Sequence, residues 1–401
     1  MDGILSDSLT GGSGTNPAEF RYSPPGILLK ANFKDLFEDY EIEGGVRLPT
    51  TFNGAEYFLV YNDKKKRLDK SYSLYRRALR FNDSNSGPSP VPPKRREVVF
   101  QGQMEARYPL DIFTSLRASA TLRMDKRIQL ATDATSLDRA TIKNQRFGIR
   151  GEYVFDNTMD IDLNIKHGTR YKIYAEVVKK MDIDLIDDFR FKANKGLMTI
   201  IGFDARHYQR LDKHSIFAIR AAGATTFGSE KMLFYLGGVE NWLFPRTNNE
   251  SQIPDPDGFA YKAQAANMRG FRTNIRNGSS FAVLNAELRV PVFKYFAKRI
   301  RSSFFRNFQM IGFFDAGTAW HGLTPYSKDN PLNTRTITTT SSNADIITVK
   351  VNYFKDPIIA GYGVGVRSVL FGYFVRLDYA WGIETREVQE PLIYLSLGTD
   401  F

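Results

Sequence analysis

The 401-residue chain contains no cysteine and only four histidines. Disulfide bonds and thiolate metal sites are therefore excluded. The histidines, at positions 167, 207, 214 and 321, show neither i, i+4 spacing nor any other metal-ligand spacing. We expect neither a metal nor a cofactor.

Long hydrophobic runs are also missing, because no stretch of about 18 apolar residues occurs, the length that a membrane-spanning helix needs. No long window shows the periodicity of an amphipathic helix either. This does not exclude a membrane protein, since the strands of a membrane β-barrel alternate between apolar and polar residues and average to low hydropathy.

The usual enzyme motifs are absent as well, including the G-x-S-x-G elbow and the Walker loop. Ser215 beside His214 is the nearest candidate for a hydrolytic pair. Adjacent residues of a strand face opposite sides, so these two cannot cooperate directly. We expect no catalytic residue and interpret the chain as a protein that is not an enzyme.

The net charge is +11, from 55 Lys and Arg against 44 Asp and Glu. The basic residues are spread in ones and twos instead of forming one patch, so we expect no nucleic-acid partner. A barrel lumen, loop tips and anionic lipid headgroups are the locations that this distribution favours.

The chain is rich in aromatic residues, at 13% with 31 Phe and 20 Tyr, which suits a sheet. Segments of alternating apolar and polar residues recur with turn signals between them. They predict about fifteen strands, at 26–34, 40–48, 55–62, 67–81, 95–108, 112–124, 141–155, 168–180, 195–209, 214–225, 279–291, 306–318, 358–369, 372–382 and 391–401.

The last predicted strand shows the alternation most clearly. Leu395, Leu397 and Phe401 share an apolar face, and Ser396 and Asp400 lie on the other. In a soluble sandwich the apolar face would be inside, whereas in a membrane barrel it is outside. Tyr, Phe and Trp cluster near strand ends, as in the aromatic girdles of membrane barrels, which favours the membrane interpretation.

The connections alternate between short and long, as expected for short periplasmic turns and long external loops. The longest, 226–278, is too long for an ordinary turn and is expected to be functional. Residues 1–25 are polar and rich in Gly, Ser and Pro, which predicts a flexible leader or the remnant of an external loop. Residues 26–401 are expected to form the barrel domain.

Several short motifs occur in the C-terminal part, namely Leu236-Gly237-Gly238, Met268-Arg269-Gly270-Phe271, Ala286-Glu287-Leu288-Arg289-Val290-Pro291, Phe313-Phe314-Asp315-Ala316-Gly317, Gly361-Tyr362-Gly363-Val364-Gly365 and a terminal Phe401. In this order and spacing they resemble the BamA/TamA superfamily of outer-membrane assembly factors, the bacterial surface-antigen barrel. The resemblance implies an all-β fold, a 16-stranded antiparallel transmembrane β-barrel, in the bacterial outer membrane.

The resemblance also implies that loop 226–278 folds back into the lumen. Its tip would be Arg269, Gly270 and Phe271, anchored by acidic residues of the next two strands, Glu287 and Asp315. The alternation of these strands independently places Glu287 and Asp315 opposite their apolar faces. An exposed Arg269, with Glu287 paired to Arg289 instead, is the alternative. Leu395, Leu397 and Phe401 would form the C-terminal signal.

The resemblance implies that 214–225 is the eleventh strand, and counting backward from it makes 26–34 the second strand of sixteen. We therefore expect that the first strand is missing and that the chain begins within the first external loop of a longer protein. The stretch from Asp35 to Phe58 resembles barrels fused to a periplasmic TolB-like β-propeller, which suggests the C-terminal barrel of such a fusion.

The resemblance implies that the protein assists insertion or export of other proteins through a lateral seam. Its partners would be the outer-membrane bilayer, unfolded or exported client proteins, and periplasmic accessory domains or lipoproteins. The alternative is a non-catalytic barrel that anchors a periplasmic propeller or serves as a surface receptor or pore.

Overall fold

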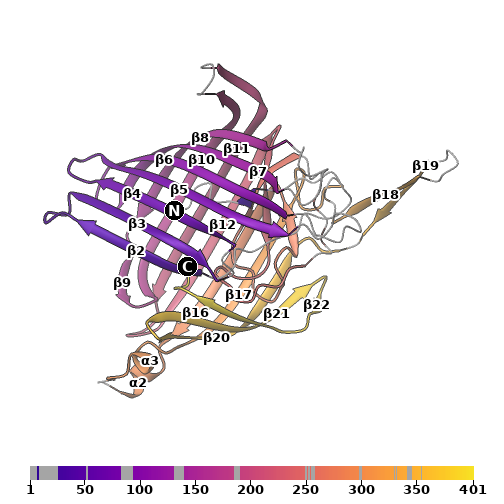
Figure 1. Ribbon diagram of the computed structural model, residues 1–401. Coiled ribbons are helices and arrows are strands. Elements are labelled where there is room, and N and C mark those ends of the chain that lie inside the picture. The colour runs from indigo at the N-terminus through magenta and orange to yellow at the C-terminus, as the bar shows by residue number, and fades with distance from the viewer. Residues whose placement is uncertain are drawn as a thin grey trace. The chain divides into compact units, whose positions relative to one another are not determined.

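The computed structural model describes residues 7–8, 26–50, 53–82, 94–130, 140–184, 190–248, 251, 253, 258–297, 300–328, 330, 332–340, 346–353 and 355–401. Within these residues, seventeen strands belong to one antiparallel sheet with the topology of a β-barrel (Figure 1). The expectation of an all-β barrel is confirmed.

Two compact units make up the chain. One unit comprises residues 22–154 and 174–199 and contains six complete strands and most of a seventh, in a meander. They are β2 (Gly26–Lys34), β3 (Tyr40–Pro49), β4 (Gly54–Asp63), β5 (Asp69–Asn82), β6 (Lys94–Pro109), β7 (Thr114–Leu130) and β8 (Ile142–Asp156), whose last residues belong to the other unit.

The other unit comprises residues 1–21, 155–173 and 200–401. Its sheet strands are β9 (Met159–Asp162), β12 (Ile216–Gly228), β16 (Ser280–Val290), β17 (Gln309–Trp320), β20 (Ile359–Leu370), β21 (Tyr373–Glu384), β22 (Glu387–Val388) and β23 (Leu392–Leu397). Strands β10 (Ile165–Asp184) and β11 (Arg190–Arg210) contribute residues to both units.

Short elements complete the second of these units. The helices α2 (Phe293–Phe296) and α3 (Ser303–Arg306) lie between β16 and β17, and a hairpin of β18 (Thr334–Thr340) and β19 (Ile346–Asn352) extends away from the sheet in Figure 1. No helix among the described residues is long and apolar enough to cross a membrane.

Each predicted strand corresponds to an observed one. The seventeen described strands include the four-residue β9 and the two-residue β22, and the other fifteen match the predicted segments with small shifts at their ends. Of residues 1–25, only Asp7 and Ser8 are described, so the prediction of a missing first strand falls outside the described residues.

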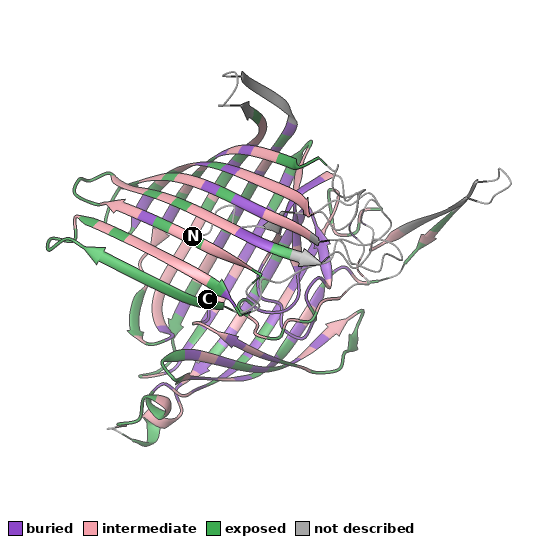
Figure 2. Cartoon of the chain, viewed as in Figure 1, coloured by how far each residue is buried: buried purple, intermediate pink, exposed green. Residues whose placement is uncertain are grey.

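The burial pattern distinguishes a membrane barrel from a soluble sandwich. On β16, Asn285, Glu287 and Arg289 are buried, whereas Leu284 and Leu288 are each 41% exposed. The same alternation of buried and exposed positions runs along many strands (Figure 2). Charged side chains inside and leucines outside are the arrangement of a strand whose outer face meets lipid.

The prediction for the last four residues was wrong. Strand β23 ends at Leu397, and Gly398 adopts φ +104°, a left-handed conformation that turns the chain out of the strand. Phe401 therefore does not continue the apolar face of Leu395 and Leu397. It packs instead against the buried residues Ile165, Tyr208, Ile216 and Ala218.

Candidate functional site

The long connection from β12 to β16 is a folded element. It contains β13 (Lys231–Leu236), β14 (Phe259–Gln264) and β15 (Arg276–Gly278), which join β1 (Asp7–Ser8) in a small sheet of order β1-β14-β13-β15. Leu233, Leu236 and Met268 are fully buried. This sheet gives the loop its own support, so the segment that follows β14 is held in a defined place.

Arg269 follows this small sheet and is bound by two carboxylates. Its Nε donates to Oδ2 of Asp315 at 2.7 Å, and its second guanidinium nitrogen donates to Oδ1 at 2.8 Å. The remaining nitrogen donates to Oε1 of Glu287 at 2.7 Å, and the backbone N–H of Arg269 donates to Asp315 at 3.1 Å. A planar guanidinium that uses its whole fork in this way is fixed in orientation as well as position.

The two acids come from adjacent strands and reach the loop because of their register. Asn285 of β16 lies directly opposite Asp315 of β17, and Glu287 lies opposite Phe313. All four side chains face away from the exposed leucines of β16. Asn285 also donates to Asp315 at 2.8 Å and to the carbonyl of Asn267 at 2.9 Å, so the amide links the strand to the loop.

Glu287 is shared between two arginines. Its Oε1 accepts from Arg269, and its Oε2 accepts from Nε of Arg289 at 2.9 Å. The two pairings that the sequence left as alternatives therefore occur together. Arg289 in turn donates to the carbonyls of Asn164 at 3.0 Å and Phe401 at 3.1 Å.

The site excludes water, which sets its electrostatics. Arg269, Glu287 and Asp315 are exposed by 3% or less. Burial by itself would lower the pKa of Arg269, but the carboxylates of Asp315 and Glu287 raise that pKa well above its ordinary value. The guanidinium also stacks 3.7 Å from the ring centre of Phe313, a further favourable contact for a cation.

Glycines allow the tip of the loop to touch the sheet backbone. Gly270 has φ +92°, and a Cβ there would lie 2.6 Å from the backbone N of Gly382 and the backbone O of Trp381. A Cβ on Gly361 would lie 2.0 Å from the carbonyl oxygen of Arg269. Any side chain at either position would push the tip away from β20 and β21.

Phe271, the third tip residue, is 3% exposed and is held through its backbone. Its carbonyl accepts from the hydroxyl of Tyr394 at 2.8 Å and from the N–H of Gly238 at 3.0 Å. Tyr394 belongs to β23 and packs against Trp242 of the same loop, with ring centres 4.7 Å apart. The loop is thus attached to β23 by polar and aromatic contacts.

A second part of the loop pairs with one edge of β23. The N–H of Gly398 donates to the carbonyl of Phe374 in β21. Backbone groups alternate in direction along a strand, so those of Ser396 also point to β21. Those of Leu395 and Leu397 point to the other edge of β23. On that other edge, the N–H of Leu243 donates to the carbonyl of Leu395 at 2.9 Å.

Two further contacts extend this pairing. Trp242 forms an antiparallel bridge with Ser396, and the side-chain amide of Asn241 donates to the carbonyl of Leu397 at 3.2 Å. Asn241 has φ +55°, a left-handed conformation that asparagine tolerates better than most residues. Residues 241–243 therefore contact the edge of β23 through one isolated β-bridge and two flanking hydrogen bonds.

A buried charge network surrounds the end of the chain. The guanidinium of Arg367 donates to both carboxylate oxygens of Asp400, at 2.9 and 3.1 Å, and lies 2.8 Å from Asp378. Asn164 donates to Asp400 at 2.9 Å. The sequence did not single out Asn164, Arg367 or Asp400. The alternation of β20 places Arg367 on the buried face, but nothing local indicates its partners.

No group of three or more His, Asp or Glu residues suited to a metal occurs among the described residues. The site joins the loop to β16, β17, β20, β21 and β23 by charge pairs, close backbone contact and one β-bridge.

Residues 64–401 match the Omp85 superfamily domain. No curated protein sequence matches the chain. Among solved structures, CdiB from Acinetobacter baumannii is similar with 11% sequence identity and a TM-score of 0.50, over 92% of this chain and 55% of that chain. This likeness shows a shared fold.

Two further structures are similar. BamA from Haemophilus ducreyi lacking POTRA domains 1–3 has 13% identity and a TM-score of 0.47, over 93% of this chain and 70% of that chain. CdiB from Escherichia coli has 10% identity and a TM-score of 0.47, over 92% and 58%. The chain spans a little over half the length of either CdiB chain.

Proposed function

The chain belongs to the Omp85 superfamily, and on that premise we propose that it assists the insertion or export of other proteins through a lateral seam in its barrel. The seam would include the edge of β23 to which residues 241–243 are bound. The mechanism makes and breaks no covalent bond. It exchanges one set of backbone hydrogen bonds for another in the bacterial outer membrane.

The observation that supports this proposal is the isolated β-bridge that residues 241–243 form with β23. An exposed strand edge attracts other strands through its unpaired N–H and C=O groups. Here the segment on the edge of β23 is only three residues long, and it is held by one backbone hydrogen bond from Leu243 and one side-chain hydrogen bond from Asn241. A client strand aligned with the six residues of β23 could form more backbone bonds than this segment, and could therefore displace it.

The Arg269 contacts set how readily the segment leaves. Arg269 and Trp242 belong to the same loop, and Tyr394 of β23 contacts both Trp242 and the carbonyl of Phe271. Holding the tip against Glu287 and Asp315 keeps residues 241–243 near the edge. We infer that Arg269, Gly270 and Phe271 position the loop, and that Glu287 and Asp315 anchor it.

A reversible lock can test the proposal. Trp242 and Ser396 are a non-hydrogen-bonded antiparallel pair, whose Cα atoms lie about 4.5 Å apart in such ladders, within the range that a disulfide spans. The double variant Trp242→Cys and Ser396→Cys would contain the only two cysteines of the chain. Its oxidised form would fix the segment on β23.

The readout is the folding of a client outer-membrane protein in liposomes that contain the variant. We expect client folding to be slow in the oxidised form and to recover on addition of reductant, with the single variant Trp242→Cys unaffected by reductant. Equal client folding in both states would contradict the seam mechanism and would favour a barrel that only anchors other domains.

A further inference from the structure

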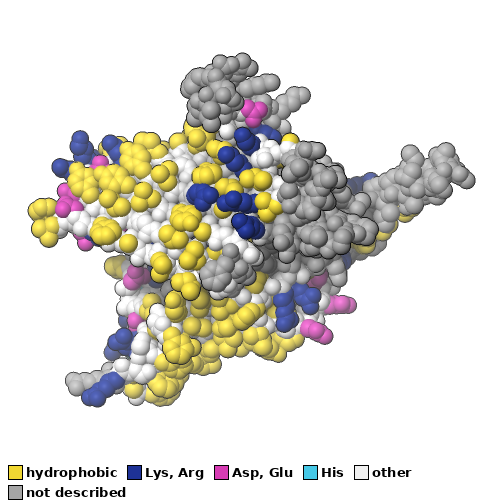
Figure 3. All heavy atoms as spheres, viewed as in Figure 1, with side chains coloured by type: hydrophobic (Ala, Val, Ile, Leu, Met, Phe, Trp, Pro, Cys, Tyr) yellow, Lys and Arg dark blue, Asp and Glu magenta, His cyan; other side chains and the backbone are white. Residues whose placement is uncertain are grey.

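In the unit that contains β4 to β7, the apolar face of the sheet carries four cationic side chains, namely Arg76, Arg80, Arg96 and Lys126. The register places Arg80 directly opposite Arg96, Val98 opposite Lys126, and Arg76 opposite Phe100. The residues of this face include Leu74 and Leu122, which are 62% and 47% exposed and belong to the lipid-facing side. Figure 3 shows Lys and Arg side chains gathered beside apolar ones on the face in view.

None of these four cations forms an ion pair among the described residues of the chain. The basic residues on the opposite face of the same strands do, since Arg95 lies 3.1 Å from Glu97 and Arg123 lies 3.0 Å from Asp125. The lumen face thus supplies a carboxylate to its cations. Among the described residues of β4 to β7, the acidic residue on the lipid-facing side is Asp63, which lies at the far end of β4 from the four cations.

The arrangement is unfavourable in the protein alone. Like charges directly opposite each other on adjacent strands are destabilising, which applies to Arg80 and Arg96. Arg76 lies deeper in the apolar band, four residues from Tyr72 along β5. A lipid-facing arginine near the middle of a bilayer costs about 2–4 kcal/mol in such barrels. An anion bound among these side chains would remove both penalties.

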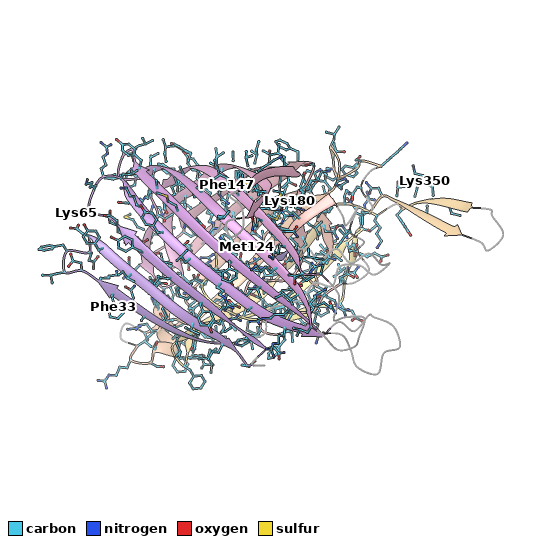
Figure 4. The ribbon with its side chains drawn as sticks, turned by 45° about the horizontal axis from the view of Figure 1, so that its top comes forward. Phe33, Lys65, Met124, Phe147, Lys180 and Lys350 are labelled. Carbon is cyan, nitrogen blue, oxygen red and sulfur yellow. The ribbon has the colours of Figure 1, made fainter. Side chains whose placement is uncertain are left out.

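An apolar groove of about 530 Å³ begins beside Arg76. Its lining comes from β8 at Gln145 and, as triplets, from four other strands, at 57–59, 74–76, 100–102 and 122–124. The register puts the first and last residues of each triplet on the lipid-facing side. Gly102 leaves the floor open between Leu74 and Leu122. Met124, labelled in mid-sheet in Figure 4, lies at the opposite wall from Tyr57.

Arg76 stands between two aromatic rings at the head of the groove. Its guanidinium carbon lies 5.8 Å from the ring centre of Tyr57 and 5.3 Å from that of Phe100. The rings hold the guanidinium at the boundary between the apolar groove and the other three cations. Such a junction suits a molecule with a hydrocarbon chain at one end and negative charge at the other.

We propose that this surface binds a lipid with a phosphorylated headgroup, with an acyl chain in the groove over Gly102 and the phosphates among Arg76, Arg80, Arg96 and Lys126. Arginine binds phosphate through paired N–H donors. The cations extend over four residues of strand, about 13 Å at roughly 3.3 Å per residue. That length exceeds one phosphate and matches a headgroup with two.

The position along the strands selects the leaflet. Arg80 is near the end of β5 and Arg96 near the start of β6, the two strands that the 83–93 connection joins. Lys126 is near the end of β7, before the 131–139 connection. Long connections of this kind face outward in membrane barrels, which assigns the lipid to the outer leaflet. The site is independent of the proposed seam.

The experiment uses the full chain in phosphatidylcholine nanodiscs with fluorescent lipid A, a glycolipid with two phosphates, as the probe. The variant Arg80→Gln, Arg96→Gln, Lys126→Gln is expected to bind lipid A at least tenfold more weakly. The control Lys70→Gln removes a cation from the same face of β5 at its other end, opposite Asp63, and should bind as the unmodified protein does.

Two further arms separate headgroup from chain. Gly102→Phe should fill the groove and weaken binding of lipid A, and inorganic pyrophosphate should compete poorly because it has no acyl chain. Heat-modifiable migration in gels confirms that each variant is folded. Equal binding of lipid A by the triple variant, or equal binding of fully dephosphorylated lipid A by the unmodified protein, would overturn the proposal.

Discussion

Arg269 and Arg76 are both arginines in apolar surroundings, but their positive charges have different kinds of partner. Arg269, in the loop of one unit, is held by two carboxylates and stacks on Phe313. Arg76, on the lipid-facing side of the other unit, lies between two aromatic rings and has no carboxylate partner among the described residues. A lumen provides its own counter-charges, whereas a lipid face leaves them to the membrane.

The comparison predicts its largest effect for the replacement of Arg269 by alanine. Arg269→Ala leaves Glu287 and Asp315 buried near each other without their cation, and loss of one partner of a buried pair costs about 3–5 kcal/mol. We expect a loss of that size in guanidinium unfolding of the protein in detergent micelles. Arg269→Lys should recover only part, because an ammonium cannot use the fork geometry. An unchanged unfolding midpoint in Arg269→Ala would refute the anchoring role.

Glycine substitutions extend the comparison to the backbone. Gly270→Ala forces a side chain into a left-handed conformation and against the backbone of Gly382 at 2.6 Å. We expect a destabilisation of about 1–3 kcal/mol. Gly102→Ala is the matched control, because its Cβ would meet only Leu74, at an ordinary 3.6 Å. Equal unfolding free energies for the two variants would show that the tip is not pressed against the sheet.

Removal of the lipid-facing cation should act in the opposite direction. Arg76→Leu relieves the penalty of a lipid-facing charge, so we expect it to stabilise the protein by about 1–2 kcal/mol in phosphatidylcholine bilayers. Added lipid A should stabilise the unmodified protein more than the variant. Urea unfolding in bilayers with and without lipid A measures both effects, and destabilisation by Arg76→Leu in phosphatidylcholine would contradict the lipid-site account.

The smallest expected effect concerns an exposed charge outside both regions. In the turn between β11 and β12, Asp212 accepts hydrogen bonds from the hydroxyl of Tyr295 and from the N–H groups of Ser215 and His214. These bonds lower its pKa from 3.8 to about 2. A lowered pKa stabilises the folded state above pH 3.8, and that contribution is lost as pH falls toward 2.

Asp212→Asn should therefore flatten the dependence of thermal stability on pH between 4 and 2, because the variant is less stable than the unmodified protein above pH 4 and nearly equal to it at pH 2. Thermal unfolding followed by circular dichroism across this range provides the measurement. A variant with the same acid dependence as the unmodified protein would show that the turn carboxylate makes no such contribution.

The strands and the two acids were predictable because both depend on local alternation. A two-residue period fixes which side chains share a face, and Glu287 and Asp315 fall opposite the apolar residues of their strands. The contact of Arg269 with them required the resemblance of the motifs as well. The structure places these three residues together, with Arg269 donating to both carboxylates.

Other features depend on contacts that the sequence does not encode locally. Leu243 and Leu395 are separated by about 150 residues, and no alternation predicts that a loop segment pairs with the last strand. The turn at Gly398 depends on buried Arg289 and Asn164, which draw Phe401 and Asp400 inward. The two-residue alternation alone predicts that the cations of β5 to β7 share the apolar face. The groove beside them can be predicted only when the register of the neighbouring strands is known.

We propose that the Arg269 contacts hold residues 241–243 on the edge of β23, and hydrogen exchange of the Leu243 amide tests this role most directly. In the unmodified protein this N–H donates to Leu395 and should exchange slowly. In Arg269→Ala we predict exchange at least tenfold faster at Leu243, with the Leu377 amide in β21 unchanged. Equal exchange at Leu243 in both proteins would contradict the claim.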